Sequence, residues 1–136
     1  MYRIYLILNR SLLTHLVPQM AHRNIIHWNC QGIQANLNEL QIIAHEFNVV
    51  IFCLQESLLA PNKQLTFEHN TAYLKFSNTT SDTRPSGGVS ILVHNTIPNS
   101  PVFLTTTLQA EGTTVTFNQT ISICNITGGA VEPALC

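Results

Sequence analysis

Glu56 is the residue with the clearest potential for chemistry, because it follows the most apolar stretch of the sequence. Residues 49–54 (VVIFCL) form an uninterrupted apolar run, typical of a strand covered on both faces, and Gln55 and Glu56 come directly after it. An ionised carboxylate beside a core is costly unless it is paired or bound to a cation. Mg²⁺ takes one or two carboxylates and completes its shell with water and phosphate oxygens. Glu56 is therefore a candidate metal ligand, and position alone also fits an exposed glutamate or a cap of the following turn.

Asn29 is a second candidate, at the end of another short β-rich run. Residues 24–28 (NIIHW) read as a strand that leads into the polar turn Asn29-Cys30-Gln31-Gly32. An amide side chain can orient a carboxylate, a water or a phosphate oxygen without adding charge. An ordinary turn asparagine would look the same in the sequence.

A helix between these two runs determines how they are placed. Apolar residues recur at spacings of three and four over residues 37–47, which predicts an amphipathic helix with Asn36 or Asn38 as N-cap. Strand, helix and strand in this order predict a βαβ unit with parallel strands. Asn29 and Glu56 then both follow the carboxyl ends of neighbouring strands, where open α/β sheets place ligand sites.

The second half of the chain is predicted to be a β-meander. Strands are expected over residues 67–76, 89–94 and 102–108, followed by a hairpin of residues 113–117 and 120–126 around Asn118-Gln119. Residues 77–88, which include Arg84, Gly87 and Gly88, are expected to be a flexible solvated loop.

Composition indicates a folded domain without a strong electrostatic preference. The chain of 136 residues is 45% hydrophobic and 10% charged, with a formal net charge of −1, so a core is expected but no basic stripe marks a nucleic-acid surface. Residues 1–22 contain no apolar stretch long enough to span a membrane and no clean signal peptide, and we interpret them as a leader outside the domain. The histidines form no ligand pair in the sequence, so we expect His45, His69 and His94 to be surface or half-buried residues. The four cysteines lack zinc-ligand spacing and are expected to be buried free thiols.

Five segments together resemble the endonuclease/exonuclease/phosphatase superfamily. They most closely resemble the start of the endonuclease domain of jockey-like non-LTR retrotransposon polyproteins, over about residues 24–127. The segments are WNCQGI at 28–33, the leucine-containing helix at 37–47, VVIFCLQES at 49–57, SGGVSILV at 86–93 and TISICNI at 120–126.

This resemblance implies a fold, an activity and site residues. The fold is α/β, the N-terminal portion of a four-layer α/β-sandwich in which a βαβ unit precedes a β-meander. The activity is Mg²⁺-dependent nicking of one DNA strand. Asn29 matches the first-motif asparagine near the metal, and Glu56 matches the metal-ligand glutamate, so both are expected to be catalytic and metal-site residues. The implied location is nuclear or cytoplasmic, with DNA as partner and no membrane.

The resemblance stops near Ile126. The motifs that would supply the activating aspartate and the supporting histidine are absent, and Asp82, the only aspartate, lies in the variable loop. We therefore expect residues 23–127 to be a partial, catalytically inactive domain and residues 128–136 to be a divergent tail. A sandwich without its second sheet would also expose an apolar face and unpaired strand edges.

Two alternatives remain open. Sequons at Asn9, Asn78, Asn118 and Asn125, the apolar leader and the Thr-rich hairpin would also suit a small secreted or surface β-rich binding module. The helix and strand motifs are also compatible with a fragment of a lipid or inositol phosphatase of the same superfamily.

Overall fold

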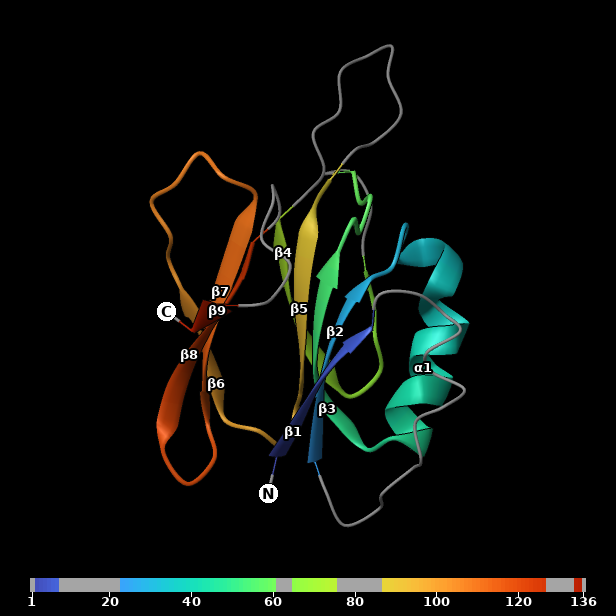
Figure 1. Ribbon diagram of the computed structural model, residues 1–136, viewed down its shortest axis with the longest axis horizontal. Helices are drawn as coiled ribbons and strands as arrows, with labels where there is room; N and C mark the ends of the chain where they lie inside the picture. Colours follow the sequence, from blue (N-terminus) through green and yellow to red (C-terminus); the bar gives the residue numbers. More distant parts are fainter. Residues whose placement is uncertain (1, 8–22, 61–64, 76–86, 127–133, 136) are drawn as a thin grey trace.

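The described part of the protein consists of one helix and two β-sheets arranged in layers (Figure 1). The structure is a computed structural model and describes residues 2–7, 23–60, 65–75, 87–126 and 134–135. The α/β prediction is confirmed at the level of a mixed fold with two sheets.

The first sheet has five strands and contains the predicted βαβ unit. Its order is β1-β2-β3-β5-β4, with β1 to β3 parallel and β5 and β4 antiparallel to their neighbours. The helix α1 connects β2 to β3 as predicted, after the 3₁₀ turn η2. The bounds are β1 Tyr2–Ile7, β2 Arg23–Asn29, η2 Gln34–Asn36, α1 Leu37–Glu46, β3 Val49–Gln55, β4 Asn70–Lys75 and β5 Val89–His94.

Helix α1 covers one face of this sheet. Its apolar stripe buries Leu40 and Ile43 against a cluster that includes Trp28 of β2 and Phe52 of β3. Asn36 occupies the N-cap position but caps no helical N–H with its side chain. Its amide instead donates to the carbonyl oxygens of Cys30 and Gly32, at 2.8 and 2.7 Å, and so fixes the turn after β2.

A second sheet covers the opposite face, which corrects our expectation of a bare apolar face. Its order is β6-β7-β8-β9, all antiparallel, with bounds β6 Asn99–Val102, β7 Ala110–Thr116, β8 Thr120–Ile126 and β9 Ala134–Leu135. Val115 of β7 and Ile123 of β8 pack on Ile51, Cys53 and other apolar side chains of the first sheet. Strand β3 is thus buried on both faces, as its composition predicts.

Strand pairing extends beyond the boundaries expected from the sequence. Tyr2–Ile7 pairs in parallel with β2, so this part of the expected leader belongs to the sheet, and residues 1 and 8–22 lie outside the described residues. Two residues of the expected tail form β9 against β8. The hairpin is confirmed, with Thr116 opposite Thr120.

The prediction of a strand at residues 102–108 is wrong. Strand β6 ends at Val102, and the connection that follows exposes 92% of Phe103. The β-rich composition of this segment was misleading because Phe103 and Leu108 stay exposed instead of packing in a sheet.

The cysteine prediction holds for two residues and fails for one. Cys30 and Cys53 are free and buried, whereas Cys124 is disulfide-bonded. No helix in the described part of the chain is both long and apolar enough to cross a membrane.

Candidate functional site

Asn29 and Glu56 come together at one edge of the first sheet, as the parallel βαβ unit requires. Asn29 is the last residue of β2 and lies opposite Gln55, the last residue of β3. Glu56 follows Gln55 directly. Asn29 is exposed and Glu56 is half-buried, so both are accessible to a ligand at this edge.

Backbone hydrogen bonds hold the loops after β2 and β3 together. The N–H of Cys30 donates to the Gln55 carbonyl at 3.0 Å, and the N–H of Gly32 donates to the Glu56 carbonyl at 2.8 Å. The pairing therefore continues past the ends of the strands and fixes Glu56 relative to the Asn29 turn.

Glu56 has a backbone conformation that non-glycine residues seldom adopt. Its φ is +52°, in the left-handed region, which costs about 1 kcal/mol or more for a residue with a Cβ. Such conformations persist only where the surroundings enforce them, and they concentrate at functional sites. Here the enforcing contacts are the Gly32 hydrogen bond and those of the next two residues, since Ser57 and Leu58 donate to the Gly88 and Gly87 carbonyls at 3.2 and 3.1 Å.

The Glu56 carboxylate accepts a hydrogen bond from the first of the two glycines that precede β5. The Gly87 N–H donates to Glu56 Oε2 at 3.2 Å, and the Gly88 N–H donates to Gln109 Oε1. Gly87 has φ +72°, and a Cβ there would overlap Gln109 Oε1. We had expected these glycines to belong to a flexible loop, and Arg84 of the same segment lies outside the described residues. The SGG sequence before a buried strand was the signal that could have indicated a fixed role.

Hydrogen bonds from the second sheet stabilise this edge of the first sheet. Asn125 of β8 is fully buried, and its Nδ2 donates to the carbonyls of Leu54 and Ser90 at 2.9 and 3.1 Å. Gln55 Nε2 donates to the Ile126 carbonyl at 2.7 Å. These long-range contacts were not predicted, because nothing in the sequence pairs residues 54–55 with residues 125–126.

Cys30 is unsuited to metal binding or nucleophilic attack although it lies in the Asn29 turn. Burial raises the pKa of its thiol to about 11, and the nearby Glu56 adds a smaller rise. The neutral thiol lies 3.5 Å from the Gln55 carbonyl oxygen, to which it donates. A thiol must be ionised to act as ligand or nucleophile, so Glu56 and Asn29 remain the candidate oxygen donors.

Two side chains with oxygen atoms lie at or just after the ends of β2 and β3 and form the candidate donor set. Glu56 has a carboxylate that accepts the Gly87 N–H on the β5 side of β3, and Asn29 has an exposed amide on the β2 side. Mg²⁺ can bind through one or two carboxylates when water and phosphate fill its other positions. Within the described ranges, no group of three or more His, Cys, Asp or Glu side chains could hold a metal ion.

Comparison with known proteins adds no assignment. No protein-family model matches the chain, and no curated protein is significantly similar to it. The function of the chain is therefore inferred from its own residues.

Proposed function

We propose that this chain carries the Glu56-containing half of the active site of a Mg²⁺-dependent DNA endonuclease, on the N-terminal portion of a four-layer α/β-sandwich. One observation carries the proposal. Glu56 is kept in a left-handed conformation, half-buried, with its carboxylate against the Gly87 N–H and its backbone joined to the Asn29 turn. The resemblance of the surrounding motifs to retrotransposon endonucleases supports the choice of DNA as substrate.

Each residue has a defined part in this proposal. Glu56 binds the cation through its carboxylate, and the Gly87 N–H limits the carboxylate to one orientation. Asn29 orients a water or phosphate oxygen at the end of β2 without adding charge. A bound Mg²⁺ supplies polarisation of a phosphoryl oxygen and stabilisation of a leaving oxygen.

The same donor set predicts weak binding and no turnover by this chain alone. A single carboxylate gives little electrostatic attraction for a divalent cation, and no carboxylate or imidazole pairs with Glu56 in the described part to act as general base. We therefore propose that the chain resembles part of an enzyme but is itself inactive.

The test uses Mn²⁺, which replaces Mg²⁺ at oxygen sites and broadens nearby NMR signals. We expect low Mn²⁺ concentrations to broaden the backbone amides around Asn29, Glu56 and Gly87 first. Glu56→Gln should abolish this local broadening, whereas Glu46→Gln, at the exposed end of α1, should leave it unchanged. Uniform broadening, or local broadening that survives Glu56→Gln, would contradict the metal site.

A nicking assay tests the inactivity separately. Supercoiled plasmid incubated with the chain and Mg²⁺ should remain intact. Nicking that Glu56→Ala abolishes would confirm the metal site and overturn the inactivity.

A further inference from the structure

A separate hollow of about 690 Å³ lies at the opposite edge of the first sheet. It forms where β2 and β3 begin and the antiparallel β5 ends, beside the last turn of α1 and the turn before β4. The Glu56 site lies at the other ends of β2 and β3, so this hollow is not part of it. Its size is within the range of small-molecule sites.

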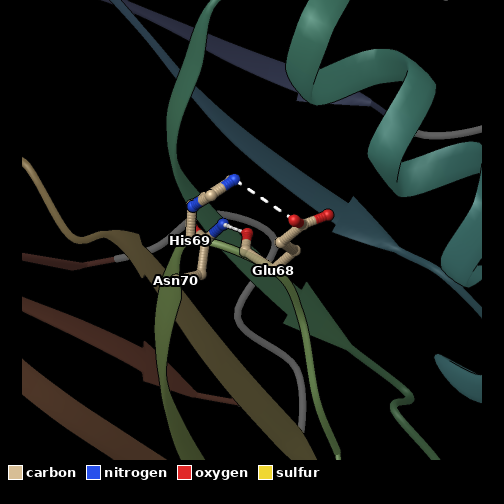
Figure 2. Close-up of polar contacts among 3 residues, drawn as sticks. All are labelled: Glu68, His69 and Asn70. Carbon is tan, nitrogen blue, oxygen red and sulfur yellow. Dashed lines mark hydrogen bonds and ion pairs between the residues drawn. The ribbon is translucent and has the colours of Figure 1, made fainter.

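The rim of the hollow gathers basic side chains that are far apart in the sequence. Arg23 begins β2, His45 is in the last turn of α1, His69 precedes β4 and His94 ends β5. Glu68 is the one carboxylate among the described lining residues, and it pairs with His69 at 3.4 Å (Figure 2). His45 and His69 are exposed and His94 is half-buried, as the sequence predicts, and the fold places all three around one cavity.

The turn before β4 fixes the position of His69. The Asn70 N–H closes it on the Phe67 carbonyl at 3.2 Å, and Asn70 Nδ2 donates to the Glu68 carbonyl at 2.8 Å (Figure 2). His69 has φ +61°, as the third residue of a type II turn requires, and its carbonyl accepts the Asn95 N–H at 2.8 Å. This last bond joins the turn directly to the end of β5.

His94 lies close to His69 with one ring nitrogen engaged. The two ring centroids are 6.4 Å apart. The Thr96 N–H donates to His94 Nδ1 at 3.2 Å, and because a backbone N–H only donates, Nδ1 is the acceptor. In the neutral ring the proton is then on Nε2, so His94 presents an N–H donor with or without a positive charge.

The floor of the hollow is apolar, unlike its rim. Val49 and Phe67 are buried lining residues of the cluster under α1, and Ala44 of α1 is half-buried against the same cluster, whereas Val50 packs in the cluster between the two sheets. A ligand that fits both surfaces carries an oxyanion for the rim and an apolar group for the floor. Inorganic ions would leave the floor without contacts.

We propose that this hollow binds a small organic oxyanion, with an apolar group on the Val49 and Phe67 floor and its charged group among Arg23, His69 and His94. Among the described lining residues, the charged or imidazole side chains are Arg23, His45, Glu68, His69 and His94.

The test is an NMR titration of the full chain with benzenesulfonate, which carries a fixed negative charge and an apolar ring. We expect saturable, single-site shifts of the His45, His69 and His94 ring protons. Methanesulfonate lacks the ring and benzenesulfonamide lacks the charge, so both should bind at least about tenfold more weakly. Equal binding of either analogue would overturn the proposal.

Substitutions test whether benzenesulfonate binds in this hollow. Arg23→Gln and His94→Gln should each weaken benzenesulfonate binding by about tenfold, since each removes a charge-assisted hydrogen bond. Lys75→Gln is the matched control, because Lys75 is an exposed cation at the other end of β4. Unchanged affinity in both rim variants, an equal loss in Lys75→Gln, or shifts that do not saturate would exclude this hollow as the binding site.

Discussion

Glu56 and Gly87 form the smallest unit on which the proposed function depends. The carboxylate accepts the Gly87 N–H, and Gly87 can take its place only because it lacks a Cβ that would meet Gln109. The left-handed φ of Glu56 means that its backbone is held by its contacts rather than by intrinsic preference, whereas glycine adopts the positive φ of position 87 without strain. Substitutions here should affect stability and the metal site together.

Gly87→Ala should destabilise the protein by about 2–3 kcal/mol, from the left-handed backbone and from the overlap with Gln109. Urea unfolding monitored by circular dichroism measures this loss. Gln109→Ala provides the control, because it removes the overlapping atom. In the double variant, Gly87→Ala should cost about 1 kcal/mol less than in the native background. Purely additive losses would show that the clash with Gln109 plays no part.

Strands β3 and β8 illustrate how elements from different sheets are joined. The Asn125 amide on β8 donates hydrogen bonds to the carbonyls of Leu54 and Ser90, which belong to two neighbouring strands of the other sheet. A buried amide in this position aligns the sheets as well as stabilising them, because its hydrogen bonds are directional. The carboxyl edge with Glu56 lies directly beyond this contact.

Asn125→Ala should lower the free energy of unfolding by about 2–4 kcal/mol, because two hydrogen bonds to buried carbonyls are lost. Asn118→Ala is the matched control, since Asn118 is exposed in the β7–β8 turn, and its effect should stay within about 0.5 kcal/mol. Thermal or urea denaturation of both variants provides the comparison. Similar effects of the two substitutions would mean that the Asn125 contacts contribute little.

At the scale of the whole molecule, helix, sheet and sheet form three layers with β3 at the centre (Figure 1). One cluster lies between α1 and the first sheet and the other between the two sheets, so the described part has a core on each side of β3. The disulfide-bonded Cys124 joins the sequons and the Thr-rich hairpin in favouring the secreted-module alternative, because disulfides are rare in reducing compartments.

Expression with the native N-terminus in cultured eukaryotic cells separates the two alternatives. The endonuclease proposal predicts that the chain stays in the cells without glycans. A secreted module would appear in the medium with a glycosidase-sensitive mass shift. Of the two described sequons only Asn118 is exposed, since Asn125 is fully buried, so Asn118→Gln should remove any glycan attached to the described part. Export with this behaviour would contradict the endonuclease proposal.

The sequence alone determined the elements that depend on local pattern. The apolar spacing over residues 37–47 specified α1, the unbroken run at 49–54 specified a strand buried on both faces, and their order specified parallel pairing. Parallel pairing was sufficient to bring Asn29 and Glu56 to the same edge. Composition led to a wrong strand prediction at residues 102–108, because β6 ends at Val102 and Phe103 stays exposed.

Tertiary structure decided the features that depend on contacts between distant residues. The second sheet on the far face of β3, the Asn125 hydrogen bonds, the Gly87 contact with Glu56 and the convergence of His45, His69 and His94 each join segments far apart in the chain. Hydrophobic periodicity shows which face of an element is buried but not which element covers it. The candidate ligands at the sheet edge were therefore readable from the sequence, whereas their orientation and the second, basic hollow were not.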